Sequence, residues 1–491
     1  MTHPMTMKMT TSMKTIDWRR FRTDVTRGLR GGAIGVPIGM VVFALLMLAS
    51  YASLGRGIST ARAHVAEAFT AGILQDEDYL RGNTDLGWHQ YNDCLILWQA
   101  IDQRASTKAL TISPISAMPE GTQTRCGTLR AFVNGGTTPT PSFYHRYIHG
   151  HTTLIRFLLP NLSVEAIRNL YHTTLTLLIL VGLCVGMVGL VRRRHPTEAL
   201  FWTILFVGFS RWFGLETFGQ SLGHGPADIV LLAYLLFLAF MGTTRGLHRR
   251  TALATAAMFG GLTAGFEFLT GGIPLGMAAV IGGIPFAVHA EREGNPAVFT
   301  FDAFAAFCAA VLTCLTAKVI LVMAVFGPGA MADSALQLRM RMGLDSSRGE
   351  TNDLGLTLMA KKLAKGLNGI APGMSVMAGA VILLAIVAGL WGAQRLLRTA
   401  DPAMRFRTIA LLASNLAVAG MLTMFWQHTM IHAWFMERTL VWPIATGFAL
   451  FALACFYTSH GVRDGPDKAD GKPHTSGKGG KVLSRPPSRP R

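Results

Sequence analysis

Residues 171–191 read YHTTLTLLILVGLCVGMVGLV, and the charged triplet Arg192-Arg193-Arg194 follows at once. The run contains no Asp, Glu, Lys or Arg and is long enough to cross a bilayer core, which takes about 20 helical residues. Basic residues next to a span favour the cytoplasmic side. The segment therefore predicts a membrane helix and also the side of the membrane on which that helix ends.

Composition extends this interpretation to the whole chain of 491 residues. Half of the residues are hydrophobic and 15% are charged, and the mean hydropathy is +0.37. A soluble chain of this kind would expose too much apolar surface, which excludes a soluble enzyme, a disordered protein and a disulfide-rich secreted fold. Nine more apolar runs bring the prediction to about ten spans, at 33–53, 197–213, 226–242, 251–269, 272–289, 301–325, 372–393, 408–426 and 440–458. The predicted fold class is an all-α membrane protein.

The basic residues decide the orientation of these spans. Arginine clusters at 192–194, 245–250 and 395–407 all face the cytoplasm if both termini are cytoplasmic, and short basic loops prefer that side. The net charge of +18 is then largely a topology signal, and no nucleic-acid partner is expected.

This topology divides the chain into segments. Residues 1–32 form a cytoplasmic N-terminus, 33–460 a polytopic transmembrane domain, and 461–491 a basic, disordered cytoplasmic tail. Two long loops, 54–170 and 326–371, lie outside the cytoplasm. Each contains an apolar stripe of helical period, over 61–73 and 356–367, which predicts a helix lying on the outer membrane surface.

Two cysteines, Cys94 and Cys126, share the first outer loop, whereas the other four fall inside spans. In an oxidising compartment these two could form a disulfide. Their pairing stays open at this point because spacing alone does not specify connectivity.

Three acidic residues of the first outer loop are candidates for chemistry. Asp93 follows an aromatic run and opens the apolar segment 94–101, where burial would raise the pKa of its carboxyl group toward that of a general base. Asp is also a preferred N-cap, so Asp93 could instead cap a helix that begins at Cys94. Asp76 and Asp78 form either a second candidate acid pair or part of a solvated turn.

The same loop ends in the cluster Tyr144-His145-Arg146-Tyr147-Ile148-His149-Gly150-His151. Its three histidines match no standard zinc spacing, so no metal is assigned, and a divalent ion is the less favoured alternative. Aromatic and basic side chains next to a span suit a phosphate or lipid headgroup, with Arg146 and Arg156 as donors. The same cluster also fits an aromatic belt at the bilayer surface.

Other polar residues gather near the predicted outer ends of the spans. The last outer loop, 426–438, contains two His, two Trp, a Glu and an Arg, which fits either a functional site or aromatic anchoring. Ionisable residues inside spans are costly and usually functional, and here they include Glu267, Lys318, Arg211 and Asp228. Snorkelling to the interface is the alternative for Lys318 and Arg211. The sequence thus predicts that the unusual polar groups collect at one surface, the outer one.

Together these features resemble the GT-C superfamily of membrane glycosyltransferases, in a poorly characterised bacterial branch. The likeness covers most of residues 15–460 and includes a cytoplasmic N-terminus, about ten spans and a long first outer loop with an acidic residue. Three motifs are similar: Tyr91-Asn92-Asp93 before an apolar run, Arg146-Tyr147-Ile148-His149-Gly150 before the second span, and 428–438 before the last. Ile148 stands where the pattern has an aromatic residue, and Glu437 where it has Tyr.

The resemblance implies transfer of a sugar from a polyprenyl-phosphate donor to a hydroxyl of a glycan, protein or lipid, at the periplasmic face of a bacterial inner membrane. Asp93 would be the general base, with Asp76 or Asp78 as the alternative. The implied phosphate- or lipid-binding residues are Arg146, His149, His432, Arg438 and Lys318, and the implied acceptor-binding or supporting residues are Tyr91, Glu267 and His428. No cofactor is implied. The alternative is a transporter or flippase for a lipid-linked or anionic solute, which would place charge at mid-bilayer. A non-catalytic scaffold in cell-envelope assembly is a third possibility.

Overall fold

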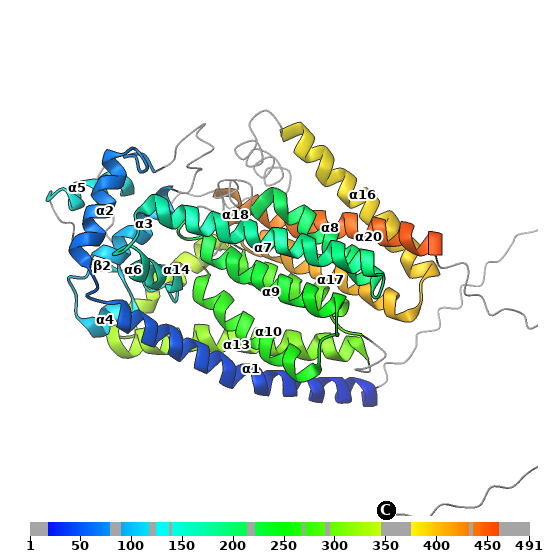
Figure 1. Cartoon of the computed structure of the whole chain (residues 1–491). Helices are drawn as coiled ribbons and strands as arrows, with labels where there is room; N and C mark the ends of the chain where they lie inside the picture. The colour runs from blue at the N-terminus through cyan, green and yellow to red at the C-terminus, as the bar shows by residue number, and fades with distance from the viewer. Residues whose placement is uncertain are drawn as a thin grey trace, which may run out of the picture.

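The computed structural model describes residues 18–78, 90–116, 124–136, 140–213, 221–267, 271–289, 295–344, 375–431 and 436–460. Within these ranges the chain is almost entirely helical, and its longer helices run side by side as a bundle (Figure 1). The bundle consists of α1 (Trp18–Ser53), α7 (Val164–Arg192), α8 (Pro196–Phe213), α9 (Gly225–Thr243), α10 (Arg249–Phe266), α11 (Gly272–Gly283), α13 (Pro296–Phe326), α16 (Ser375–Thr399), α17 (Pro402–Met424) and α20 (Val441–His460). Each predicted span falls on one of these helices.

Seven of them are long and apolar enough to cross a membrane, which agrees with a multi-pass, all-α membrane protein. They are α1, α7, α9, α13, α16, α17 and α20. The predicted spans on α8, α10 and α11 are not among the seven. α11 is short because Pro285 follows it and the chain continues as the 3-10 turn η3 (Ile284–Phe286). The count of about ten spans therefore stays a prediction.

Small residues let the bundle helices approach one another closely. A Cβ atom on Gly39 of α1 would lie 2.8 Å from the Cα atom of Ala310 in α13. A Cβ atom on Gly282 of α11 would lie 2.7 Å from the ring of Trp442 in α20. Helices in lipid gain contact area where such side chains are absent. Large apolar side chains stay exposed on α1, α7, α13 and α16, as expected of helix faces that contact lipid.

Between α1 and α7 the chain folds into a small domain, the loop domain, at one end of the bundle (Figure 1). It contains α2 (Ile58–Thr70), α3 (Gln90–Ile101), α4 (Thr107–Ile112), α5 (Arg125–Val133), α6 (Gly150–Leu158) and two short antiparallel strands, β1 (Ile115–Ser116) and β2 (Ser142–Phe143). Its own hydrophobic core is centred on α3, in which every residue except Tyr91 is buried.

The helix predicted over 61–73 is present as α2, but its apolar stripe does not face the membrane. Val65 and Phe69 are buried in the core of the loop domain, which they share with Leu97 of α3 and Leu129 of α5. The prediction of a surface helix on lipid was wrong because an amphipathic period is the same whether its apolar face meets lipid or protein.

The remaining elements complete the same end of the bundle. They are α14 (Ala330–Arg341), α18 (Trp426–Ile431) and the 3-10 turn η4 (Glu437–Leu440). The amphipathic helix predicted over 356–367 lies outside the described residues. We call the end that carries α2–α6 and α14 the loop end, and the opposite end, with the arginines at 192–194 and 395–407, the arginine end (Figure 1).

Candidate functional site

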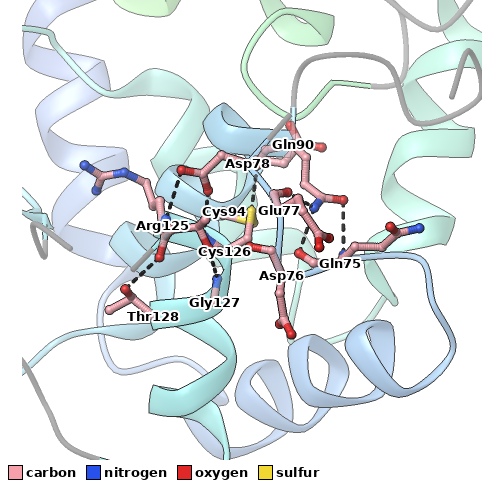
Figure 2. The surroundings of a disulfide bond; sticks show 12 residues. Gln75, Asp76, Glu77, Asp78, Gln90, Cys94, Arg125, Cys126, Gly127 and Thr128 are labelled. Carbon is pink, nitrogen blue, oxygen red and sulfur yellow. Dashed lines mark hydrogen bonds between the residues drawn. A yellow bond between two sulfur atoms is a disulfide. The ribbon is translucent and has the colours of Figure 1, made fainter. Parts of the chain in front are cut away.

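A disulfide fastens the loop domain together. Cys94 of α3 and Cys126 of α5 are bonded with their Cα atoms 5.2 Å apart, and they are separated by 32 positions in the sequence (Figure 2). Both cysteines are fully buried. The structure thus contains the pair that the sequence left open, and the bond ties α5 to the central helix of the domain.

The acidic turn at 76–78 is part of the same framework (Figure 2). The carboxylate of Asp78 accepts hydrogen bonds from the backbone N–H groups of Arg125, at 3.0 Å, and Cys126, at 2.9 Å. These are the first amides of α5, so Asp78 satisfies donors that a helix leaves unpaired at its start. Asp76 pairs with Arg130 at 2.8 Å, and both side chains are about half exposed, at 49% each. Both acids therefore bind groups of α5 and help to hold the loop domain together.

Asp93 lies within α3, and both of its carboxylate oxygens accept hydrogen bonds. Helix α3 begins at Gln90, so Asp93 lies in the first turn and the prediction that it caps a helix starting at Cys94 was wrong. One oxygen, Oδ2, accepts from Arg168 Nη2 at 2.6 Å and Nε at 3.0 Å. The other, Oδ1, accepts from the Leu222 N–H at 2.9 Å and from the Ser221 hydroxyl at 3.2 Å.

Asp93 is only 1% exposed. Burial raises the pKa of its carboxyl group, and the Arg168 guanidinium opposes that rise. Because both oxygens are already bonded, a substrate hydroxyl could reach them only after the ion pair broke. The residue instead joins α3 to the start of α7 and to the segment before α9. Sequence reasoning missed Arg168, although a lone arginine near the start of an apolar run was a signal for a buried ion pair.

His149 is held in an unusual conformation at the start of α6. Its φ of 65° lies in the left-handed region, which is uncommon for residues other than glycine and collects at functional sites. Its Nε2 lies 2.7 Å from the Tyr144 carbonyl oxygen, which can only accept, so Nε2 holds the proton and Nδ1 carries the lone pair. Burial and the nearby charge of Lys318 hold the pKa of this imidazole well below its usual range. His149 is therefore a neutral ring with a fixed tautomer.

Two cations lie buried around this histidine. Arg156 is 3% exposed and donates to the Gln99 carbonyl at 3.0 Å, and burial lowers the pKa of its guanidinium to about 10. Lys318 is also 3% exposed, and its ammonium donates to the Ile112 carbonyl and, at 3.3 Å, to the Ser113 hydroxyl. Within the described part of the chain, neither cation pairs with a carboxylate.

A set of half-buried groups lies beside these cations, and we call it the Arg146 cluster: Tyr144, Arg146, Tyr147 and Arg341. The Arg146 guanidinium lies 5.1 Å from the centre of the Tyr144 ring and pairs with Asp333 of α14 at 3.0 Å. The two tyrosine rings are 5.7 Å apart. Burial raises the pKa of both phenols and the Arg341 charge opposes this, so the four groups share one electrostatic environment.

Two buried carboxylates, Glu267 and Asp228, lie in the bundle. Glu267 follows the last residue of α10, is 7% exposed, and accepts a hydrogen bond from the Ile273 N–H at 2.8 Å. Its charge is among the causes that raise the pKa of Tyr147. Deeper in the bundle, Arg438 of η4 contacts both oxygens of Asp228 in α9 at 3.0 Å. The charge of Glu267 thus acts on the Arg146 cluster, whereas Asp333 contacts Arg146 directly.

The remaining predicted site residues do not all lie near the Arg146 cluster. The His428 ring contacts the guanidinium of Arg341, a member of the Arg146 cluster. Tyr91 lies under the guanidinium of Arg125, 5.0 Å from it. His432 lies outside the described residues. Among the residues described, no three His, Cys, Asp or Glu side chains are grouped so that they could hold a metal ion.

Buried charged pairs also occur at the arginine end, in addition to the polar groups predicted at the outer ends of the spans. At the arginine end, Arg407 of α17 pairs with Glu198 of α8 at 2.5 Å, and Arg249 pairs with the fully buried Asp302. The His195 and His289 rings also stack there, 3.8 Å apart. The partners in each pair are far apart in the sequence, so the apolar runs alone do not predict these contacts.

Comparison with protein-family models, with curated proteins and with solved structures finds no match to this chain. The resemblance to the GT-C superfamily therefore stays a hypothesis, and the function must be inferred from the residues themselves.

Proposed function

We propose that the protein transfers a sugar from a polyprenyl-phosphate donor to an acceptor hydroxyl at the loop end, with the Arg146 cluster and Glu267 as the reaction site. One observation carries this proposal. The half-buried Arg146 guanidinium lies 5.1 Å from the Tyr144 ring, the charges of Arg146 and Arg341 act on both Tyr144 and Tyr147, and the charge of the buried Glu267 acts on Tyr147. Cations that stabilise a leaving phosphate and a carboxylate that accepts a proton are the two groups that this reaction needs.

The transfer can be written with these groups alone. The acceptor oxygen attacks C1 of the sugar, and the bond between C1 and the phosphate oxygen breaks. The electron pair of that bond stays on the phosphate, which leaves with one more negative charge that Arg146 and Arg341 stabilise. The hydroxyl proton goes to Glu267. Tyr144 and Tyr147 carry raised pKa values, so they stay protonated and can donate hydrogen bonds to the phosphate.

The location favours a lipid-borne donor. Nucleotide sugars are cytoplasmic, whereas the arginine distribution predicts that the loop end lies outside the cytoplasm. The disulfide in the loop domain supports that side, because disulfides persist in oxidising compartments. Reporter fusions after Gly135 should read as external and fusions after Arg194 as cytoplasmic. The reverse pattern would place the site in the cytoplasm and remove the reason for a lipid donor.

Asp93 takes a positioning role in this proposal. Its bond to Arg168 orients α3 relative to α7, and α3 in turn carries Gln99, which contacts Arg156 and Thr152 of α6. The strained His149 lies at the start of that same helix. Loss of Asp93 would therefore disturb the site through packing and leave the reacting groups in place.

The position of buried charge favours this reaction over transport. The buried ion pairs and cations of the described residues lie toward the helix ends, as with Asp228 near the start of α9 and Asp302 near the start of α13. Coupled transporters place charge or binding groups near mid-bilayer. For this reason we rank transport second, after sugar transfer, as the function of this protein.

Radiolabelled sugar transfer by the purified protein, given a polyprenyl-phosphate sugar, tests the proposal. Glu267→Gln should lower turnover by about 10²- to 10⁴-fold, the usual contribution of general acid–base catalysis. Arg146→Gln should lower it as well, because a phosphate contact is lost. Asp78→Asn is the matched control, since an amide oxygen can still cap α5, and it should retain most of the turnover.

Asp93→Asn separates the two candidate bases. If Asp93 only positions α3, the variant should lose stability but keep measurable transfer at low temperature. If Asp93→Asn folds normally and abolishes transfer while Glu267→Gln remains active, Asp93 is the base and the assignment of Glu267 is wrong.

A further inference from the structure

A cavity of about 460 Å³ opens at the loop end, between α1, α4 and α13. Met47 of α1 and Leu321 of α13 form its apolar floor, and Tyr51, Thr107 and Lys108 form its polar rim. Ile112, the last residue of α4, lines the wall. α4 lies across the neighbouring ends of α1 and α13 (Figure 1). Thr107, Lys108, Thr111 and Ile112 of α4 line the cavity, so we call α4 its roof.

The roof is fixed to both long helices. The Ser50 hydroxyl of α1 donates to the Thr111 carbonyl at 2.9 Å, and the Lys318 ammonium of α13 donates to the Ile112 carbonyl. These are carbonyl groups from the last turn of α4, which a helix leaves without partners of its own. The buried Lys318 is therefore committed to holding α4 in place, which explains why a charged residue lies inside the membrane-spanning α13.

The rim offers positive charge without a counter-ion. Lys108 and Thr107 are exposed, and Lys108 forms no ion pair with any described residue. The Tyr51 side chain is 59% exposed at the same rim. A phosphate head would find an ammonium and hydroxyl donors here, and charge-assisted bonds of this kind are the strong ones.

Met47 and Leu321 each have an exposed apolar neighbour in the sequence. Leu48 of α1 is 62% exposed and Ile320 of α13 is 55% exposed, and both belong to helices able to span the membrane. A lipid chain could therefore reach the cavity sideways from the bilayer, while its head stayed at the rim. The combination of apolar floor, cationic rim and lateral access suits an amphiphile with an anionic head.

We propose that this cavity binds the phosphate head and the first chain carbons of a lipid monophosphate, with Lys108 as the phosphate-binding cation. The identity of the lipid as a polyprenyl carrier rests on the proposed function, but binding can be measured without any transfer. The cavity is a second phosphate site, separate from the Arg146 cluster that binds the phosphate during transfer, and the chain links the two. Ser113, which follows Ile112, contacts the His145 ring at 3.0 Å, and His145 precedes Arg146 in the chain.

A photoreactive polyprenyl monophosphate tests the proposal in the full chain, reconstituted in phosphatidylcholine nanodiscs. Crosslinks should fall on α4 and on the peptides that contain Met47 and Leu321. Lys108→Gln should weaken binding by about tenfold, the usual effect of losing one charge-assisted hydrogen bond. Arg56→Gln is the matched control, because Arg56 is exposed at the same end but does not line the cavity, and it should bind like the parent protein.

Three further arms identify the ligand. Inorganic phosphate and phosphatidylglycerol should compete poorly, and polyprenol without its phosphate should crosslink weakly. Leu321→Trp, which fills the floor, should reduce crosslinking even with Lys108 intact. Equal binding by Lys108→Gln, equal competition by phosphatidylglycerol, or crosslinks confined to other helices would overturn the proposal. Binding without any sugar transfer would leave the cavity assigned and refute the proposed function instead, whereas transfer unaffected by Lys108→Gln would refute the cavity alone.

Discussion

The two ends of the bundle contain buried charge in different arrangements. At the arginine end, Glu198 of α8 meets Arg407 of α17, and the guanidinium also lies over an aromatic ring of η3. At the loop end, Arg156 and Lys318 are buried without a carboxylate partner among the described residues, and Arg341 also forms no ion pair there. The buried arginine described at the first end is paired with a carboxylate, whereas two buried cations at the other end are not.

This difference separates structural polar groups from functional ones. A buried ion pair links two helices and leaves nothing for a ligand, so its loss should reduce stability. Lys318 and Arg156 donate to backbone carbonyl groups, whereas the half-buried Arg146 and Arg341 can still meet an anion. We therefore expect substitutions at the arginine end to affect folding, and substitutions at the loop end to affect binding and turnover.

The largest change in stability should come from the arginine end. Arg407→Met leaves Glu198 buried without its partner, which costs about 3–5 kcal/mol of unfolding free energy in comparable sites. The midpoint of thermal unfolding in detergent should fall markedly. The double variant Glu198→Gln with Arg407→Met should recover most of the loss, because no unpaired charge remains. An Arg407→Met protein as stable as the parent would contradict a structural role for this pair.

The disulfide should have the next largest effect, confined to the loop domain. Closing a loop of 32 residues stabilises a fold by about 3–4 kcal/mol in the chain-entropy estimate. Cys126→Ser should therefore increase hydrogen exchange and proteolysis in α2, α3 and α5 while the bundle helices stay protected. Alkylation of freshly purified, denatured protein should find neither Cys94 nor Cys126 free, and two free thiols would contradict the bond.

The buried histidines predict a dependence of stability on pH. Burial lowers the pKa of His151 to about 3 and also lowers that of His149, whereas an unfolded histidine titrates near about 6.5. Below that value the unfolded chain binds protons that the native state does not. Stability should therefore fall as the pH drops from 6.5 toward 3, by about 1.4 kcal/mol per pH unit for His151, and His149 should add to this fall.

The measurement is the unfolding midpoint between pH 5 and pH 8. His151→Gln removes one titrating group, so its midpoint should depend less steeply on pH below 6.5 than that of the parent. An unchanged slope would mean that His151 does not stay neutral in the folded protein.

The smallest stability effect should come from the exposed pair of the Arg146 cluster. Asp333 is 59% exposed, so losing its bond to Arg146 should cost no more than about 1 kcal/mol. Asp333→Asn also frees the Arg146 guanidinium from a competing acid. We expect the KM for the lipid-linked donor to fall or stay the same while stability hardly changes. A large rise in KM would show that Asp333 supports the site.

Several features followed from the sequence alone. Each predicted span coincides with a helix because the length of an apolar run and its period are local properties that need no knowledge of neighbours. The arginine clusters likewise gather at one end of the bundle. The sequence also selected Cys94, Cys126 and the 144–151 segment as important, since their residue types are unusual next to a membrane.

Only the tertiary structure decided what these residues do. Asp93 was predicted as a base or a cap, yet its partner Arg168 is 75 positions away. Lys318 meets Ile112 across 206 positions, and Asp228 meets Arg438 across 210. A carboxylate or an ammonium has the same intrinsic chemistry wherever it stands, so its role depends on whether an opposite charge, a carbonyl group or open space lies beside it. Those neighbours are brought together by helix packing, and a pattern read along the chain does not contain them.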